Sequence, residues 1–356
     1  MILLALACAP VIPEDSALDT GGGDSDSAVA TAVVTTTSAD YASALLATVQ
    51  LSTMIITDRI TTAPTDSQVV SEDGLVYVLG RFGVDAVRVY EPGEWVEPIQ
   101  EFSTGDASNP QDVKECGGSV YVSLYGSTEV KRYDPETWLL RGVVDLSSLA
   151  DSDGIPEVAN MIERDGVLYV ALQQLDQENG WVANGGLVAS IDCATGALLR
   201  SFVAAPDPTL HDVPGSAKLM VRTGLYFAND GGVGWFDPRT GTEAPLLTEA
   251  ALGEEITDLA MVDATHGIVV THAENHDFTT WCWNPDDNAL VELFTTPSSF
   301  QGLKAVGDDV WIVARAGWAD YLSPTGVIVV DAIACEPGAE RWLTDFEFPP
   351  FSVDFY

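Results

Sequence analysis

The segment THAENHDF, from Thr271 to Phe278, concentrates groups that could bind a metal ion. It contains two imidazoles, His272 and His276, and the carboxylates of Glu274 and Asp277. Neutral imidazole nitrogens and a carboxylate are ligands that transition metals accept. The two histidines would align on a helix, but the segment lies between β-rich runs and is predicted to be a loop. No third histidine lies close by on that loop, so a solvated loop remains the alternative to a metal site. His211 and His266 stand at predicted turns and are expected to be surface residues.

A second set of polar residues offers oxygen ligands. These residues stand at or near the start of short β-rich runs, and they could converge on one axis if those runs line a common channel. Carboxylate and amide oxygens suit calcium. The candidate ligands are Asn109, Asp112, Asn160 and Asp258. The stretch DSDG from Asp151 lacks the spaced acidic positions and the closing glutamate of a calcium loop, so turn chemistry explains it better.

The strongly negative net charge and the absence of some catalytic motifs argue against several classes of function. The 356 residues include 54 Asp+Glu and 15 Lys+Arg, which gives a formal net charge of −39. Such a chain lacks the basic surface that nucleic acids require, and anionic membrane surfaces repel it. A hydrophobic content of 46% argues against disorder. No GxSxG nucleophile motif and no phosphate-binding glycine loop occurs, so the sequence gives little support to nucleophilic catalysis.

A repeat in the sequence predicts the elements that must carry these polar residues. A β-rich run, a short loop, a second β-rich run and an acidic turn follow one another six times between about residues 65 and 349. The anchors are separated by 42–48 residues in all but one interval. Four short strands per unit of this length predict a propeller blade. The repeats are anchored at Gly74, Gly118, Gly166, Gly224, Gly267 and Asp309.

The two ends of the chain supply a seventh blade. Three β-rich runs lie between residues 30 and 62, and the C-terminal PFSVDFY resembles the first run of a unit. We therefore predict an all-β, seven-bladed propeller of four-stranded antiparallel blades. Its last blade is closed by three N-terminal strands and an innermost strand from residues 351–356. This closure removes the open sheet edges that are hazardous in β proteins.

In such a blade, the loop between the second and third strands lies on the same rim as the entry to the innermost strand. Residues on this rim surround the channel mouth and form a polar surface with several aromatics, as binding sites often do. The alternative is that they are merely solvated loop residues. The entry positions add Lys218 and Gln301, and further rim residues are Tyr41, Gln174 and Asp230. The candidate ligand-binding residues are Arg81, Phe82, Tyr125, Gln173, Trp181, Asn229, His272, His276, Arg315 and Trp318.

The N-terminus predicts export and anchoring. MILLALA followed by Cys8 resembles a bacterial lipoprotein signal, in which Cys8 would be lipidated. Residues 9–27, rich in Pro, Gly, Asp and Ser, predict an acidic flexible tether. Residues 28–356 are then a single propeller domain. An apolar N-terminus with an incidental cysteine is the alternative to the signal.

Four further cysteines fit an oxidising compartment, where an even count favours disulfides. Composition alone leaves three pairings open, and free thiols are an alternative. In the predicted blades, all four cysteines lie near turns on the rim opposite the candidate site. In this predicted arrangement of blades, a disulfide between Cys116 and Cys193 and one between Cys282 and Cys335 would each join neighbouring blades.

The runs GLVYVLGRFGVDAVRVYEPGEW and GSVYVSLYGSTEVKRYDPETW resemble blades of YVTN-type repeat propellers. Those propellers are similar to the quinoprotein-dehydrogenase-like and gluconolactonase-like seven-bladed folds. The resemblance covers about residues 30–356 and implies the fold more than a function. A gluconolactonase-like fold implies a divalent cation in the channel, but the acidic residue that starts the first blade in that family has no clear match here.

Three functional hypotheses follow. The first is a non-enzymatic, lipid-anchored propeller of the bacterial cell envelope, expected to be a monomer, which binds a small molecule or an envelope protein. The second is a calcium-dependent lactonase or hydrolase of the gluconolactonase type. The third, a cofactor-dependent dehydrogenase relative, ranks last because no cofactor motif is found. No nucleic acid is expected as a partner, and the membrane is expected to be contacted only through the anchor.

Overall fold

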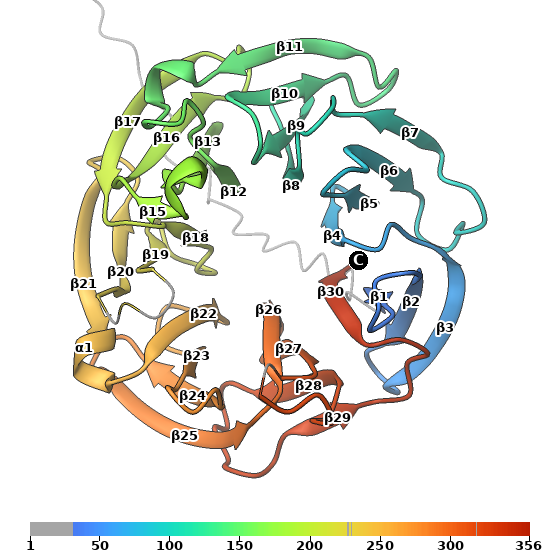
Figure 1. Cartoon of the computed structure of the whole chain (residues 1–356), viewed down its shortest axis with the longest axis vertical. Helices are drawn as coiled ribbons and strands as arrows, with labels where there is room; N and C mark the ends of the chain where they lie inside the picture. The colour runs from blue at the N-terminus through green and yellow to red at the C-terminus, as the bar shows by residue number, and fades with distance from the viewer. Residues whose placement is uncertain (1–30, 226–227, 229, 318) are drawn as a thin grey trace, which may run out of the picture.

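The chain forms a ring of seven four-stranded antiparallel sheets around a central channel (Figure 1). The computed structural model describes residues 31–225, 228, 230–317 and 319–356. No helix within these residues has the length and apolar composition needed to cross a bilayer. The prediction of an all-β propeller is therefore confirmed, and blades are numbered here from the first complete one in the chain.

Each blade is ordered from the channel outwards. Blade 1 comprises β4 (Ser67–Glu72), β5 (Leu75–Gly80), β6 (Ala86–Tyr90) and β7 (Gln100–Ser103). Blade 2 comprises β8 (Pro110–Cys116), β9 (Ser119–Leu124), β10 (Glu129–Tyr133) and β11 (Leu140–Asp145). Blade 3 comprises β12 (Val158–Arg164), β13 (Val167–Leu172), β16 (Gly186–Asp192) and β17 (Leu198–Ala204).

The second half of the ring repeats this order. Blade 4 comprises β18 (Thr209–His211), β19 (Leu219–Thr223), β20 (Gly232–Asp237) and β21 (Thr242–Thr248). Blade 5 comprises β22 (Glu255–Met261), β23 (Gly267–His272), β24 (Phe278–Asn284) and β25 (Ala289–Thr296). Blade 6 comprises β26 (Ser299–Val306), β27 (Asp309–Arg315), β28 (Gly326–Asp331) and β29 (Arg341–Leu343).

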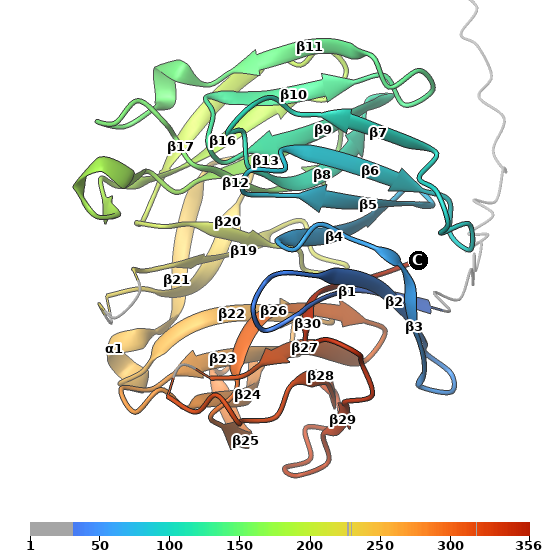
Figure 2. The same cartoon turned by 45° about the vertical axis from the view of Figure 1, so that its right-hand side comes forward.

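Blade 7 joins the two ends of the described chain, as predicted. Its strands are β30 (Pro350–Phe355), β1 (Thr31–Thr37), β2 (Ala44–Gln50) and β3 (Ile55–Thr62), which lie side by side in Figure 2. β30 pairs with β1 in a register that sets Val353 against Val34 and Phe355 against Ala32. The ring is thus closed by a ladder between residues more than 300 positions apart.

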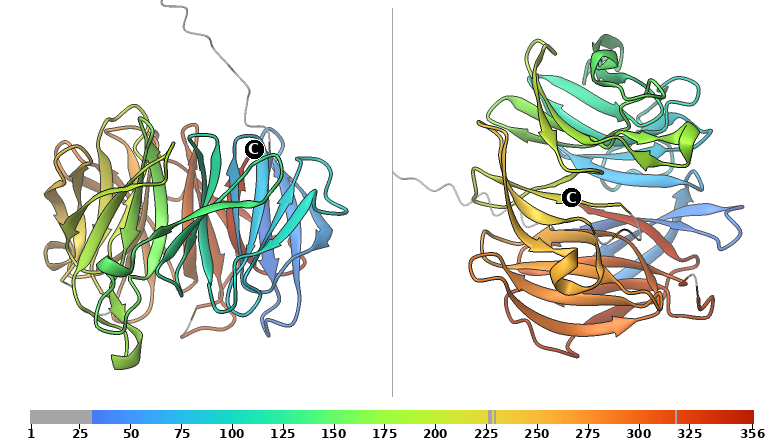
Figure 3. Two further views of the ribbon diagram at one scale, coloured as in Figure 1. Left: turned by 90° about the horizontal axis from the view of Figure 1, so that it is seen from above. Right: turned by 60° about the vertical axis from the view of Figure 1, so that its left-hand side comes forward.

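The connections between strands define two faces of the ring, which Figure 3 (left) shows edge-on. We call upper the face that carries the loops between the second and third strands of each blade and the connections between blades. The lower face carries the other turns. The short elements η1 (Ser147–Leu149), η2 (Gln177–Asn179), α1 (Glu249–Leu252) and the hairpin β14 (Leu175–Asp176) with β15 (Val182–Ala183) all lie in upper-face connections. β1 begins and β30 ends at the lower face.

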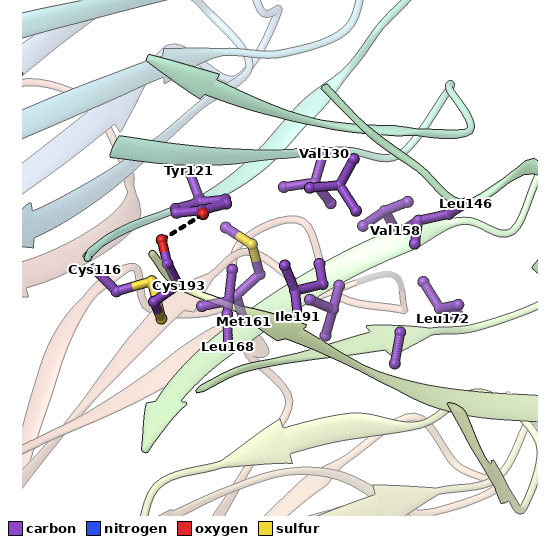
Figure 4. Packing of buried hydrophobic residues seen from close by; sticks show 13 residues of the cluster. Cys116, Tyr121, Val130, Leu146, Val158, Met161, Leu168, Leu172, Ile191 and Cys193 are labelled. Atoms are coloured by element: carbon purple, nitrogen blue, oxygen red, sulfur yellow. Dashed lines mark hydrogen bonds between the residues drawn. A yellow bond between two sulfur atoms is a disulfide. The ribbon is translucent and has the colours of Figure 1, made fainter. Parts of the chain in front are cut away.

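The hydrophobic core is divided among the blade interfaces. The buried apolar residues form seven clusters, and each cluster takes its members from two neighbouring blades. Figure 4 shows the cluster between blades 2 and 3, where Tyr121 of β9 packs beside Met161 of β12 and Leu168 of β13. Alternating strand residues therefore face opposite neighbours, so both faces of each sheet are buried.

Two disulfides join neighbouring blades at the lower face, with the pairing that the repeat map predicts. Cys116 binds Cys193 across blades 2 and 3, and Cys282 binds Cys335 across blades 5 and 6. The turn after Cys116 approaches the partner blade closely. Gly117 has φ +55°, and a Cβ there would lie 2.3 Å from the carbonyl oxygen of Cys193, so only glycine fits.

We predict that deleting Phe351–Tyr356 destabilises the whole ring. The deletion removes nearly all of β30, so β1 loses its ladder and the buried Val353 loses its place in the interface between blades 6 and 7. Several backbone hydrogen bonds and one buried aliphatic side chain predict a fall in Tm of about 10 °C or more. Thermal melting by circular dichroism measures it, and an unchanged Tm would disprove the closure.

Removal of one disulfide should lower stability without opening the ring. The double variant Cys282→Ser/Cys335→Ser is expected to lose roughly 2–4 kcal/mol in the free energy of unfolding. Denaturant unfolding under non-reducing conditions measures the loss, and wild-type protein with a reducing agent is the control. Peptide mapping that finds four free thiols in the purified protein would contradict the pairing.

Candidate functional site

The upper face collects most of the rim residues that the sequence singled out. The loops between second and third strands bring them there from six blades, together with the end residues of the flanking strands. Asn229 and Trp318 lie outside the described residues. The described candidates are Tyr41 (blade 7), Arg81 and Phe82 (blade 1), Tyr125 (blade 2), Gln173 and Trp181 (blade 3), His272 and His276 (blade 5) and Arg315 (blade 6).

Exposed aromatic side chains are confined to this face among the described residues. The large hydrophobic residues that remain exposed include four aromatics, which are between 50% and 82% accessible. All four lie in loops between second and third strands: Tyr41, Phe82, Trp181 and Tyr321. The exposed aliphatic residues, by contrast, are found on outer strands and lower-face turns as well. Tyr321 was missed at the sequence level, although it follows Trp318 in the same predicted loop.

Two arginines organise the channel mouth between blades 6, 7 and 1. Arg315 is buried and donates to the carbonyl oxygens of Thr37, Pro349 and Pro350 at 3.3–3.4 Å. Its guanidinium also lies 5.4 Å from the ring centroid of Tyr41 and 5.3 Å from that of Phe351. Burial lowers the pKa of Arg315. Arg315 therefore fastens blade 6 to blade 7 and fixes the aromatic side chains of the mouth.

Arg81 holds the other side of the mouth. Its Nη2 lies 2.6 Å from Oδ1 of Asp66, and its Nη1 donates to Oε1 of Gln111 in blade 2 at 3.0 Å. The guanidinium lies 5.6 Å from the ring centroid of Phe351. Phe351 thus stands between two arginines, at the start of the strand that closes the ring.

The histidine-rich loop brings its two imidazoles together. Nδ1 of His276 lies 3.4 Å from Nε2 of His272, and the two rings stack with centroids 5.5 Å apart. Nδ1 of His272 lies 3.3 Å from Oε2 of Glu255, a buried carboxylate on β22. Glu274 is exposed in the loop. Across the described part of the chain, no three His, Cys, Asp or Glu side chains form a group that could hold a metal ion.

The insertion in blade 3 forms an ordered hairpin on the upper face. Buried Glu157 accepts hydrogen bonds from the Leu175 backbone at 2.9 Å and from Nε2 of Gln177 at 3.0 Å. Burial raises the pKa of Glu157 to about 7, although these two hydrogen bonds favour its charged form. They fix the base of the hairpin, and its tip presents Trp181 to solvent.

The channel contains a cavity of about 630 Å³. It extends from Arg81 and Phe351 near the upper face to Arg164 near the lower face. Three of the four candidate calcium ligands line it, namely Asp112, Asn160 and Asp258, whereas Asn109 does not. The cavity lies within the range of small-molecule sites.

The three candidate calcium ligands in the channel form hydrogen bonds with the backbone of neighbouring blades. Oδ2 of Asp112 accepts the Met161 N–H of blade 3 at 2.8 Å, and Oδ2 of Asp258 accepts the Leu303 N–H of blade 6 at 3.0 Å. Asn160 exchanges two hydrogen bonds with the backbone of Leu210 in blade 4. These side chains satisfy the open edges of innermost strands, and the acidic ones do not gather into a metal group. The calcium hypothesis stays a prediction.

Two sequence assignments in blade 4 were wrong. His211, placed at a surface turn, ends the innermost strand β18 and lines the cavity. Lys218, placed at the entry to the innermost strand, lies in the lower-face connection before β19. The cause is that β18 has only three residues, so the run from Ala217 to Arg222 was taken as the first strand of the blade when it holds most of the second.

The channel also carries lysines that the sequence did not single out. Lys114 Nζ donates to Oε2 of Glu72 at 2.7 Å, and Lys304 Nζ lies 3.5 Å from Oδ2 of Asp354. Both pairs cross between blades. Their partners are one repeat apart along the chain, at separations of 42 and 50 residues. The sequence signal that could have revealed these pairs is a polar residue that has another polar residue one repeat away along the chain.

Burial shifts the pKa values of the titratable residues in the channel. Desolvation raises the pKa of Asp258 to about 6 and also raises the pKa of Asp112, although Lys304 acts in the opposite direction on both. Desolvation lowers the pKa of His211 to about 3, and Arg222 and Lys304 add to that effect. At neutral pH the ionised carboxylate of Asp258 thus lies near a neutral imidazole.

The raised pKa of Asp258 predicts a pH-dependent contribution to stability. The native carboxyl keeps its proton up to about pH 6, whereas the unfolded one releases it near 3.8. The stabilisation is complete below the unfolded value and is lost as the pH rises through 6. The advantage of wild type over Asp258→Asn should therefore shrink between about pH 5 and about pH 7.5 in urea unfolding.

The control for this experiment is Asp237→Asn. Hydrogen bonds with Arg239 lower the pKa of Asp237, so its titration falls below that pH range. The stability difference between wild type and this control should stay constant from about pH 5 to about pH 7.5. An Asp258→Asn difference that is equally constant would contradict the burial effect.

Solved propellers share this architecture at low sequence identity. A Bacteroides fragilis protein provisionally assigned as a 6-phosphogluconolactonase superimposes with a TM-score of 0.63 and 10% identity, over 92% of this chain and 98% of that one. Hydrazine synthase from Kuenenia stuttgartiensis gives 0.56 and 17%, over 83% and 94%. Apo AztD from Citrobacter koseri gives 0.51 and 9%, over 91% and 97%. No protein-family model and no curated protein matches the chain. The likenesses show that the chain is a seven-bladed β-propeller.

Proposed function

We propose that this protein is a non-enzymatic binding propeller of the bacterial cell envelope, anchored through Cys8, whose upper face receives a ligand or partner. The observation that carries the proposal is the confinement of exposed aromatics to that face. Tyr41, Phe82, Trp181 and Tyr321 come from four different blades, so their shared exposure does not follow from one irregular loop. Exposed aromatic side chains provide much of the binding energy in protein interfaces and ligand sites.

The position of the chain ends supports this arrangement. β1 begins at Thr31 on the lower face, so a tether running from Cys8 would join the ring on that side. The upper face would then point away from the membrane surface. An anchor and a binding surface on opposite faces do not compete for space.

Rigid support of the aromatics favours binding over a solvated-loop interpretation. Tyr41 packs edge-on against Phe351 at 6.3 Å and lies under the guanidinium of Arg315. Trp181 is carried by a hairpin whose base is hydrogen-bonded to buried Glu157. Side chains fixed before binding lose less conformational entropy when a partner arrives.

Site-specific photo-cross-linking in intact cells tests the proposal. A photoreactive phenylalanine analogue would replace Phe82 or Tyr321 on the upper face, which are 80% and 82% exposed. The controls are Leu139 and Val96 on lower-face turns, at 69% and 83%. We expect a discrete cross-linked product from the first two positions and none from the controls. Equal products at all four positions, or none at any, would contradict the proposal.

The anchor can be checked in the same strains. The variant Cys8→Ser should move the protein from the membrane fraction to the soluble fraction, because a lipidated cysteine supplies the membrane affinity. Retention of the variant in the membrane fraction would contradict lipid anchoring. The cross-linking result would still stand on its own.

A further inference from the structure

The channel cavity has features of a second binding site, distinct from the aromatic upper face. Its volume of about 630 Å³ exceeds what a few buried waters need. It is lined by charged side chains of both signs and by apolar ones, so it is neither a simple acidic hollow nor a dry void.

Two lysines in the cavity have N–H donors that their protein partners do not use. The chain has only four lysines, and two of them, Lys114 and Lys304, line this cavity. Within the described chain each ammonium makes one hydrogen bond, to Glu72 and to Asp354 respectively. An ammonium group carries three N–H donors. Both lysines can therefore also bind a carboxylate of a ligand.

The same cavity is lined by the hydrogen-bond acceptors His211 and Asp258. Nε2 of His211 is buried and has no hydrogen-bond partner among the described residues, and the His211 side chain is only 12% exposed. Nδ1 of His211 lies 3.9 Å from Oδ1 of Asp258. Each oxygen of Asp258 accepts one backbone N–H, so each has a lone pair left.

His211 adds no positive charge beside Asp258. Because burial lowers the pKa of His211 to about 3, the imidazole is uncharged at neutral pH. An ammonium group of a ligand can therefore pair with the Asp258 carboxylate without competition from an imidazolium.

The net charge of the protein narrows the chemical class of the ligand further. A simple anion would approach a chain of net charge −39 against its field. A simple cation would be attracted but would meet Lys114 and Lys304 inside the cavity. A ligand that carries both charges avoids both penalties and uses both sets of groups. Phe351 and Pro214, which also line the cavity and are not buried, add apolar surface for the rest of the ligand.

We propose that the channel binds a zwitterion of the amino-acid class with an apolar side group. Its ammonium pairs with the Asp258 carboxylate, its carboxylate is bound by Lys304 and Lys114, and its side group contacts the apolar part of the cavity lining. The inference deepens the proposed binding function and rests on it.

Titration calorimetry with matched probes tests the ligand class. L-leucine carries both charges, 3-methylbutylamine lacks the carboxylate, and 4-methylpentanoate lacks the ammonium, while all three share one apolar group. We expect L-leucine to bind at least about tenfold more tightly than either analogue. Equal affinity of the amine would show a cation site, and equal affinity of the acid would show an anion site. Either result, or no heat from any probe at about 10 mM, overturns the proposal.

Variants locate the site. Lys304→Met should weaken L-leucine binding by about tenfold or more and leave 3-methylbutylamine binding unchanged or tighter, because only the carboxylate contact is lost. Lys218→Met, on the lower face, is the matched control and should change neither. Asp258→Asn should weaken both ammonium-containing probes. Circular dichroism confirms that each variant is folded, and an effect of Lys218→Met equal to that of Lys304→Met would overturn the assignment.

The two proposals can fail separately. Cross-linking at Phe82 and Tyr321 reports on the upper face, and calorimetry reports on the channel. Cross-links that persist while no zwitterion binds would remove the channel inference alone. Absence of both would remove the binding function as well.

Discussion

The whole structure depends on each four-stranded sheet burying both of its faces against neighbours. The seven apolar clusters lie one at each interface between blades, so a blade outside the ring would expose two hydrophobic faces. This constraint explains how the described residues fold around one channel without one large core. It also makes the pairing of β30 with β1 decisive, because that ladder brings the first and last blades into contact.

A second constraint comes from the innermost strands, whose free edges face the channel. Their unpaired N–H groups would be costly unless another group accepts them. Asp112, Asp258, Ser352 and Asp354 supply those acceptors, each to the first strand of the next blade. The polar residues that the sequence suggests as a metal site therefore also hold neighbouring blades together by hydrogen bonds. The remaining lone pairs and the lysines beside them give the channel its chemistry.

The fold could be predicted in detail because its signal is periodic. Turn residues and β-rich runs recur at one spacing, and the same map placed Cys116 near Cys193 and Cys282 near Cys335. The site could be predicted only in part. Loop positions follow from the repeat, but contacts such as Lys114 with Glu72 depend on side chains that meet across an interface. His211 was misplaced because a three-residue strand has too little sequence to reveal a period.

The brevity of β18 has a consequence for traffic through the channel. β18 makes only three residue pairs with β19, whereas the corresponding strands β26 and β27 of blade 6 make seven. No disulfide among those found here crosses either seam of blade 4. Few backbone hydrogen bonds hold β18 in place, so local opening of the channel wall beside His211 costs less than opening at a long innermost strand such as β26. Fraying of this one short strand would widen the channel for a ligand while the β1–β30 ladder stays intact.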